Sequence, residues 1–223
     1  AVARAVNRQL HVPAVRVGTG PTPMREVISS GFPALDAATG LGGFPRGRLT
    51  DLIGRPTAGC ATVAARAVAG AAGHAAWVDV AGLVDVDAVA RCGVDLERLF
   101  ILRPQDRNDA LGIAAQLIAS DQFAVVVLDA LSDLASDGKA AEAVSRFVRV
   151  VAPSLGRGST AALVLSAPEQ HYRSMAHAAA LRISLVRTGL IRRGGVLRGW
   201  RAHARILKSP GRQGGESGIE IWL

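Results

Sequence analysis

Two glycines five positions apart mark the segment whose residue types and spacing come nearest to phosphate chemistry. A strongly apolar stretch, residues 49–53, runs into Gly54-Arg-Pro-Thr-Ala-Gly59, and an alanine-rich segment of helical character follows. A phosphate-binding loop has the form G-x-x-x-x-G-K-[ST] between a strand and a helix. Here the glycine spacing is kept, but Cys60 occupies the lysine position and Ala61 the Ser/Thr position.

Those two replacements remove the groups that handle a nucleotide. The loop lysine reaches the β- and γ-phosphates, and the loop hydroxyl is a ligand of Mg²⁺. Thr62 stands one position too late, on a different face of the helix. Backbone N–H groups at the helix N-terminus could still hold an anion, but we expect weak triphosphate binding, negligible hydrolysis, no catalytic residue and no cofactor.

The remaining reactive residue types form no recognisable site. Cys60 and Cys92 fall in different segments without metal-ligand spacing, and His171 and His177 fit no zinc signature. We therefore expect no metal. With two cysteines, no signal peptide and no apolar run of the length that crosses a bilayer, the sequence predicts a cytoplasmic protein that enters no membrane.

The elements that position the loop follow an alternating pattern. Apolar strand-like runs occupy residues 49–53, 75–79, 99–102, 123–129 and 161–166. Helical segments are predicted between them, at residues 57–72, 84–92, 109–120 and 139–152. Because alternating strands and helices build βαβ units, we predict a doubly wound α/β fold with a mostly parallel central sheet.

The last 45 residues change character. Apolar and polar residues alternate from Leu181 and again around Trp200 and Ile221, with a turn at residues 192–195. This period of two predicts antiparallel strands with one solvated face at the C-terminal end of the sheet. The predicted division is an N-terminal arm and linker, residues 1–26, and a core domain, residues 27–223.

Charge is concentrated in the same C-terminal strands. The chain has a net charge of +8, and residues 181–223 carry nine basic and two acidic side chains. The candidate residues for binding DNA or an acidic partner are Arg182, Arg187, Arg192, Arg193, Arg198, Arg201, Arg205 and Lys208. A basic surface points to a polyanion or an acidic protein; a solvated arginine-rich face is the alternative.

The residues before the altered loop resemble bacterial RecA. Ile28-Ser-Ser-Gly-Phe-Pro-Ala-Leu-Asp36 and Gly40-Leu-Gly-Gly-Phe-Pro-Arg-Gly-Arg-Leu49 match its approach to the phosphate loop, and Gly93-Val-Asp95 matches a further RecA tripeptide. Val125-Val-Val-Leu-Asp129 resembles the Walker B strand, so Asp129 matches the Walker B aspartate. The similarity covers residues 12–223 and implies a RecA-like core.

The same resemblance implies that the ATPase site has been lost. The catalytic glutamate of RecA corresponds to Val80 or Ala81, and its nucleotide-sensing Asn-Gln pair corresponds to Ser166-Ala167. The DNA-binding loop that follows is reduced to residues 168–180. Lys208 stands near lysines that reach a neighbour's nucleotide in RecA. An ATP-binding RecA relative or clock-type ATPase is the alternative, and it requires a cation such as Arg55 or Arg66.

A RecA-like core with lost catalytic residues resembles the ImuA mutagenesis family. Phe32-Pro-Ala-Leu-Asp36, Gly42-Gly-Phe-Pro-Arg-Gly47 and a short N-terminal helix carry the likeness. It implies a role in DNA-damage-induced (SOS) translesion synthesis, with RecA, the polymerase-like protein ImuB and an error-prone polymerase as partners. A single-stranded-DNA-binding recombination mediator is the alternative.

The N-terminal arm is the candidate surface for binding RecA. Val2, Val6 and Leu10 have helical spacing, and Val15-Arg16-Val17 resembles the strand with which a RecA protomer packs on its neighbour. An added strand can pair with another chain's sheet edge. We predict that this arm binds RecA; a helix folded back on its own core is the alternative.

Overall fold

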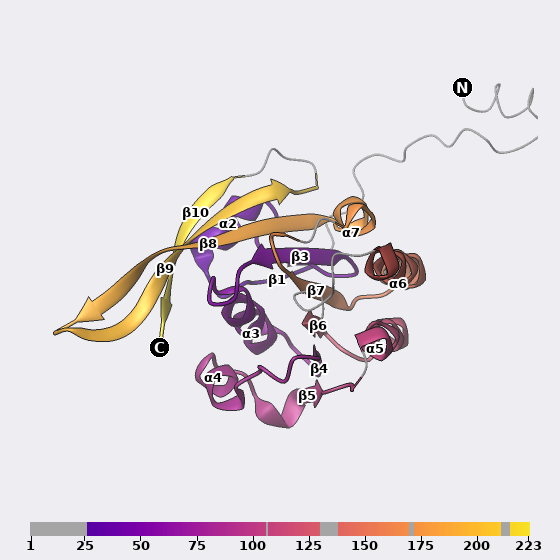
Figure 1. The fold of residues 1–223 in the computed structure, drawn as a ribbon, viewed down its shortest axis with the longest axis horizontal. Helices are drawn as coiled ribbons and strands as arrows, with labels where there is room; N and C mark the ends of the chain where they lie inside the picture. Colours follow the sequence, from indigo (N-terminus) through magenta and orange to yellow (C-terminus); the bar gives the residue numbers. More distant parts are fainter. Residues whose placement is uncertain (1–25, 106, 130–137, 170–171, 211–214) are drawn as a thin grey trace, which may run out of the picture.

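The computed structural model describes residues 26–105, 107–129, 138–169, 172–210 and 215–223. Its centre is an eight-stranded mixed sheet with the strand order β10-β9-β8-β3-β7-β6-β4-β5 (Figure 1). The strands β3 to β8 all pair in parallel with their neighbours in this group. The strand β9 pairs antiparallel with β8 on one side and with β10 on the other. The predicted α/β architecture is therefore confirmed.

The parallel strands are short and apolar, as strands covered on both faces must be. They are β3 (Leu49–Gly54), β4 (Ala75–Asp79), β5 (Leu99–Leu102), β6 (Val125–Asp129) and β7 (Ala161–Ser166). Their carboxyl ends meet along one edge, where ligands bind in open α/β sheets. The loop after β3 lies at that edge.

Helices cover the two faces of the sheet (Figure 1). On one face lie α3 (Cys60–Gly70) and α4 (Val86–Arg91), whose buried side chains pack with Trp77, Val127 and Leu165. On the other lie α5 (Arg107–Ser120), α6 (Gly138–Arg157) and α7 (Arg173–Ala178). Alternate residues of each strand therefore enter two separate cores.

Short elements complete the fold. They are β1 (Val27–Ile28), which pairs with β2 (Phe44–Pro45), the helix α2 (Pro33–Thr39) and the 3₁₀ turn η1 (Leu96–Arg98). The sequence pattern did not predict α2 or α7, because six or seven residues are too few to show a helical period. In α2, Asp36 accepts hydrogen bonds from the Ser29 hydroxyl and the Ser30 N–H and so fixes the segment before the helix.

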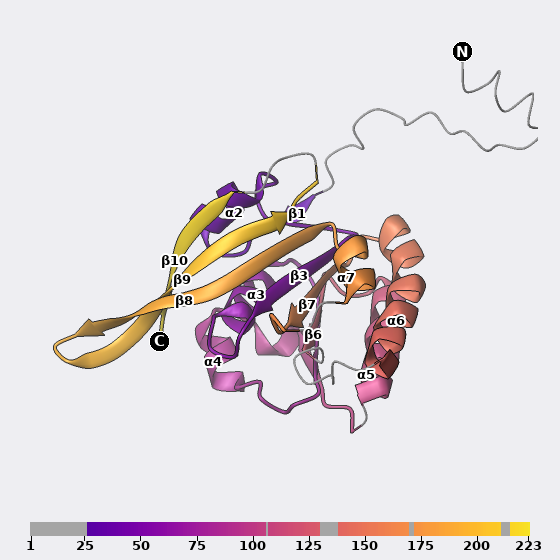
Figure 2. The same cartoon turned by 45° about the horizontal axis from the view of Figure 1, so that its top comes forward.

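Three antiparallel strands close the chain: β8 (Leu181–Arg193), β9 (Val196–Lys208) and β10 (Glu216–Trp222). Gly194 and Gly195 have φ angles of 57° and 80°, as the two-residue turn that matches the twist of a hairpin requires. The β8–β9 hairpin extends beyond the body of the protein (Figure 2). Among the described residues no helix is long and apolar enough to span a bilayer.

Candidate functional site: the altered phosphate loop and the C-terminal strands

The loop between β3 and α3 keeps the backbone shape that its glycines suggest. Gly59 is the N-cap of α3 with φ of 110°, and Thr57 also has a positive φ, 69°. A Cβ atom at Gly54 would lie 2.7 Å from the Cys60 sulfur and 3.1 Å from the Leu185 carbonyl oxygen. Glycine is therefore required at position 54 by close packing.

The C-terminal strands pack directly against this loop. A Cβ at Gly59 would clash with Ile221 of β10 and lie 3.6 Å from Nε1 of Trp200 of β9. Trp200 is half-buried against the adjacent core. The loop is thus held in shape by apolar contacts from the chain itself, which makes it part of the scaffold.

Cys60 adds no charge to the loop. Burial, together with the negative charges of Asp129 and Asp51, raises the pKa of its thiol to about 12. At neutral pH the side chain is therefore an uncharged thiol beside two carboxylates. A lysine in this place would supply a cation that reaches the phosphates, and Cys60 cannot replace it.

A buried carboxylate ties three strands together below the loop. Asp51 of β3 accepts hydrogen bonds from the Ser166 hydroxyl of β7, at 2.6 Å, and from Arg182 Nε of β8, at 2.9 Å. Ser166, the residue at the sensor position of the RecA-like pattern, is therefore engaged in a structural network. Sequence reasoning missed Asp51, although one carboxylate within an otherwise buried strand signals a partner.

A second buried carboxylate shapes the loop where a catalytic glutamate would stand. Asp79 accepts hydrogen bonds from the N–H groups of Leu83 and Val84, at 3.0 and 3.1 Å, and from Arg103 Nε, at 3.1 Å. Within this loop Val80 is half-buried and Ala81 is exposed. Neither side chain can polarise a water molecule.

A pocket of about 400 Å³ lies between the loop, α4 and the carboxyl ends of β4, β6 and β7. Most of its lining is apolar, and it includes Trp77, Val89, Leu165 and Trp200. The charged residues of the described lining are Arg55, Asp85 and Asp129, and Arg55 pairs with Glu169 at 2.7 Å. The other candidate cation, Arg66, packs against Gly31.

These residues do not fit a magnesium–nucleotide complex. The two carboxylates outnumber the one cation, the loop hydroxyl is missing, and Cys60 is neutral. Polyphosphate binding needs compensating positive charge in a site of low dielectric constant. Asp129 alone does not provide such a site. A Walker B aspartate acts through a magnesium ion that the Ser/Thr hydroxyl of the phosphate loop also binds, and Ala61 occupies that position.

Three of the eight basic candidates form ion pairs with described carboxylates of the protein itself. Arg182 pairs with Asp51, Arg201 with Glu220 at 3.0 Å, and Arg205 with Glu216 at 3.4 Å. Because Glu216 and Glu220 lie on the neighbouring strand, they neutralise this part of the sheet. The continuous basic face expected from the sequence is therefore interrupted.

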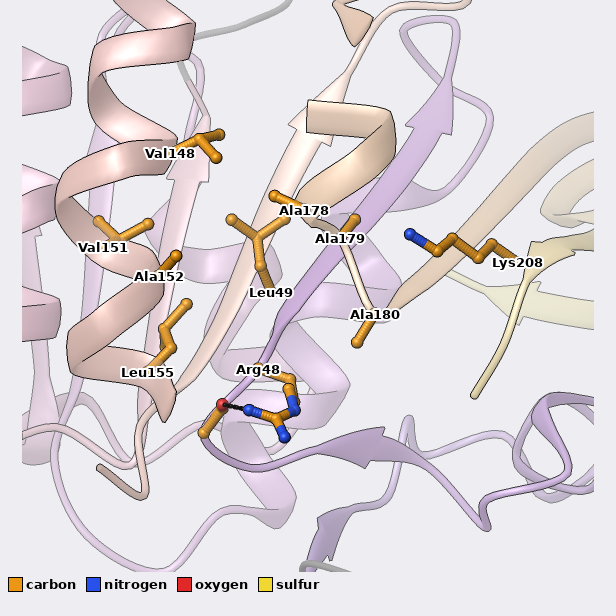
Figure 3. A pocket seen from close by; sticks show the side chains of 11 residues that line it. Arg48, Leu49, Val148, Val151, Ala152, Leu155, Ala178, Ala179, Ala180 and Lys208 are labelled. Carbon is orange, nitrogen blue, oxygen red and sulfur yellow. Dashed lines mark hydrogen bonds between the residues drawn. The ribbon is translucent and has the colours of Figure 1, made fainter. Parts of the chain in front are cut away.

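Lys208 has a structural position as well. Its ammonium group donates to the carbonyl oxygens of His177, at 2.7 Å, and Ala176, at 3.2 Å, at the end of α7. Burial, and then the nearby Arg182, lower its pKa. Figure 3 shows it at the rim of a depression of about 270 Å³ whose floor includes Leu49 and Val151. This depression lies between α6, α7 and the start of β3, away from the altered loop.

The other four arginines gather on the distal half of the β8–β9 hairpin. They are Arg187, Arg192, Arg193 and Arg198, and none forms an ion pair with a described carboxylate. Arg193 lies over the Trp222 ring at 5.3 Å, and Arg192 donates to the Gly195 carbonyl oxygen. The RecA-binding candidates of the arm, Val2, Val6, Leu10, Val15, Arg16 and Val17, lie outside the described residues.

Comparison with known proteins supports the RecA-like reading of the fold. Residues 5–148 match the model of the RecA N-terminal domain. The RecA protein of Corynebacterium efficiens is 39% identical over 123 residues, which are 54% of this chain and 32% of that protein. The RecA protein of Aquifex aeolicus is 29% identical over 212 residues, which are 82% of this chain and 61% of that protein. The RecA protein of Kineococcus radiotolerans is 33% identical over 167 residues, which are 68% of this chain and 48% of that protein. The chain thus spans from a third to three fifths of these relatives' lengths.

Proposed function

The chain belongs to the RecA N-terminal domain family, and on that premise we propose that it is a non-catalytic RecA-like accessory protein of DNA-damage-induced mutagenesis. It binds RecA and the polymerase-like protein ImuB, supports the associated error-prone polymerase in translesion synthesis, and modulates the RecA filament. The observation that carries the proposal is a RecA-type loop whose phosphate-binding residues are the neutral Cys60 and Ala61.

Three features support a role without ATP turnover. The loop lacks the lysine and the hydroxyl, the pocket beside it has an excess of carboxylates, and the loop before α4 has no acid at positions 80 and 81. Without the lysine and with an excess of carboxylates, the charge of the phosphates is not neutralised. Without the hydroxyl a ligand of the metal is missing, and without the acid no side chain orients the attacking water. Restoring one residue would leave the others missing.

The proposal of RecA and ImuB as partners is supported by sequence likeness. Phe32-Pro-Ala-Leu-Asp36 and Gly42–Gly47 resemble the ImuA family, and residues 15–17 resemble the strand that joins RecA protomers. A subunit that adds to a RecA filament but contributes no nucleotide contacts would end or weaken that filament. This is how we propose that the protein modulates RecA.

The test is a binding assay with purified RecA and ImuB. The full chain is expected to retain both partners on a column, and deletion of residues 1–18 is expected to abolish retention of RecA while keeping the far-UV circular dichroism of the core. Strand exchange by RecA should slow when the full chain is added. Unchanged RecA binding by the shortened chain would show that the arm is not the binding element.

A single-stranded-DNA-binding mediator is the second candidate function, favoured by the four arginines that pair with no described carboxylate and by Trp222 beneath Arg193. Single-strand binders combine basic grooves with aromatic stacking platforms. Fluorescent single-stranded DNA at two salt concentrations tests it, because phosphate contacts weaken steeply with salt. Binding that is absent or independent of salt would exclude this candidate.

A further inference from the structure

The distal ribbon, defined as residues 186–198, is a two-stranded extension with little support from the sheet. On the β8 side, pairing with β3 ends at Leu185. On the β9 side, pairing with β10 covers Gly199 to Arg205, and one further hydrogen bond joins the Leu223 N–H to the Arg198 carbonyl oxygen. Within the described part of the chain, the outer edge of β8 from residue 186 to residue 193 therefore has no neighbouring strand (Figure 2).

Local contacts hold this ribbon in a defined shape. The Gly194-Gly195 turn has the paired positive φ angles of a tight hairpin. Arg193 lies over Trp222, and Ile191 is buried although it is near the tip. Register shifts next to Arg187 and Ile191 increase the local twist. A binding partner would thus meet a preformed surface, which lowers the entropic cost of association.

The ribbon carries uncompensated positive charge. Its four arginines have no ion pair with a described carboxylate, and the sequence has no Asp or Glu between Glu169 and Glu216. Beyond the ribbon the situation reverses, because Glu216 and Glu220 neutralise Arg205 and Arg201. A polyanion laid along the whole sheet would meet these two carboxylates, so the attractive surface is limited to the ribbon.

Aliphatic side chains are exposed among the arginines. Val186, Leu190, Val196 and Leu197 are between 41% and 58% exposed. A phosphate backbone would satisfy the arginines but leave these side chains in water, whereas a protein segment would bury them at a gain of roughly 25 cal/mol for each Å². Apolar side chains exposed among the arginines therefore favour a protein segment over a nucleic acid at this ribbon.

We infer that the distal ribbon binds an extended acidic segment of a partner protein, which carries aliphatic side chains and adds as a strand to the free edge of β8. Backbone hydrogen bonds to an open edge provide affinity, and alternate side chains provide specificity. Opposite charges across a strand pair are favourable, so carboxylates of the added strand face arginines of β8 that lie on the same side of the ribbon. This inference rests on the proposed role as a partner-binding protein.

Neither the N-terminal arm nor the acidic stretch around α4 fits as this partner. Residues 1–18 contain Arg4, Arg8 and Arg16 and no acidic residue, so the arm would be repelled. The acidic stretch around α4 is already folded: Asp85 accepts hydrogen bonds from the N–H groups of Asp87 and Ala88, and Asp79 is buried. The charge complementarity therefore points to a different protein.

The test uses the full chain and a fluorescein-labelled eight-residue peptide of alternating glutamate and valine. Fluorescence anisotropy should show saturable binding. The double variant Arg192→Ser/Arg193→Ser should weaken it by roughly threefold, the scale set by one cross-strand charge pair, because glutamates at alternate positions share one face and meet only one of these two adjacent arginines. The matched control is Arg149→Ser/Arg157→Ser, which removes the same charge from the exposed face of α6 and should leave binding unchanged.

Two further comparisons separate strand addition from simple charge attraction. Leu190→Ser should weaken binding and Leu207→Ser should not, although both leucines are 46% exposed. A peptide with alternate N-methylated backbone amides should bind much more weakly than the parent, because it cannot complete the strand pairing. Equal binding of the methylated peptide would overturn the inference.

Three other outcomes would also overturn it. The first is that a 20-nucleotide single strand or duplex binds more tightly than the peptide and depends on Arg192 and Arg193. The second is that the ribbon and α6 double variants weaken peptide binding equally. The third is that the protein self-associates with rising concentration and the ribbon variant abolishes this association. Circular dichroism of each variant establishes that it is folded. The ribbon variants keep residues 1–18, so their binding to RecA should be unchanged. Failure of this inference is therefore distinguishable from failure of the proposed function.

Discussion

At the scale of single residues, Asp51 shows what holds the altered site together. Its carboxylate is buried and receives hydrogen bonds from Ser166 and Arg182, which come from the strands on either side of β3. A buried ion pair contributes little net stability when complete, but removal of one partner leaves a charge without compensation. Asp51 therefore matters for the assembly of the sheet, with no nucleotide involved.

We predict that Asp51→Ala destabilises the protein by about 3 kcal/mol, because Arg182 is then left nearly buried and unpaired. Glu220→Ala, which breaks the exposed pair with Arg201, is the matched control and should cost less than about 1 kcal/mol. Urea denaturation followed by circular dichroism measures both. Equal effects would mean that Arg182 finds another partner.

The two cysteines should differ in reactivity. The thiolate is the nucleophile, and burial raises the pKa of Cys60 to about 12 and that of the half-buried Cys92 to a smaller extent. At pH 8 Cys60 is therefore almost wholly protonated. In native protein we expect a disulfide reagent to label Cys92 first, and the rate at Cys60 to rise about tenfold per pH unit up to pH 11. Cys60→Ala should remove the slow phase, and rapid labelling of two thiols at pH 8 would contradict this prediction.

At the scale of elements, the loop and the last two strands form one packing unit. Gly59 at the start of α3 contacts Ile221 of β10 and approaches Trp200 of β9. Elements separated by more than 100 residues are thus joined at the position where a nucleotide-binding protein would keep its loop open. The packing gives Gly59 a structural role that does not depend on a nucleotide.

Gly59→Ala should destabilise the protein by about 2 kcal/mol or more, because the new methyl group meets Ile221 and the residue has φ of 110°. Gly218→Ala on β10, where a Cβ would touch nothing within 4 Å, should change stability by less than about 0.5 kcal/mol. Thermal unfolding of the two variants provides the comparison. In a double-mutant cycle, Gly59→Ala should cost less stability in an Ile221→Val background, because valine lacks the Cδ1 methyl group that the new Cβ meets.

How far the elements could be predicted depended on their length and burial. The buried strands β3, β4 and β6 consist mostly of apolar residues, so the sequence located them to within two residues. Helix α6 extends to Arg157, past the predicted end at residue 152, and includes Pro153. The pairing of Arg201 and Arg205 with β10 could not be foreseen, because it depends on strand register, and register is set by turns and long-range packing.

At the scale of the whole molecule, the protein keeps the RecA-type sheet while a group of arginines projects away from the phosphate loop. The charged residues that line the pocket beside the loop are two carboxylates and one arginine, and four arginines without an ion pair to a described carboxylate lie on the distal ribbon. A fold that binds nucleotide needs the opposite distribution, with cations at the carboxyl ends of the parallel strands. The charge distribution therefore favours partner binding at the hairpin over chemistry at the loop.

The same distribution predicts the response of the whole protein to nucleotide. A ligand that binds only the folded state stabilises it by RT ln(1 + [L]/Kd). With a dissociation constant above about 1 mM, 1 mM MgATP adds less than about 0.4 kcal/mol. For a chain of this length that raises the unfolding midpoint by about 1–2 °C at most. Differential scanning fluorimetry measures the shift, with magnesium pyrophosphate as the control for anion binding. A rise above about 4 °C with MgATP alone would show that the loop still binds a nucleotide and that Cys60 and Ala61 are compensated by cations elsewhere.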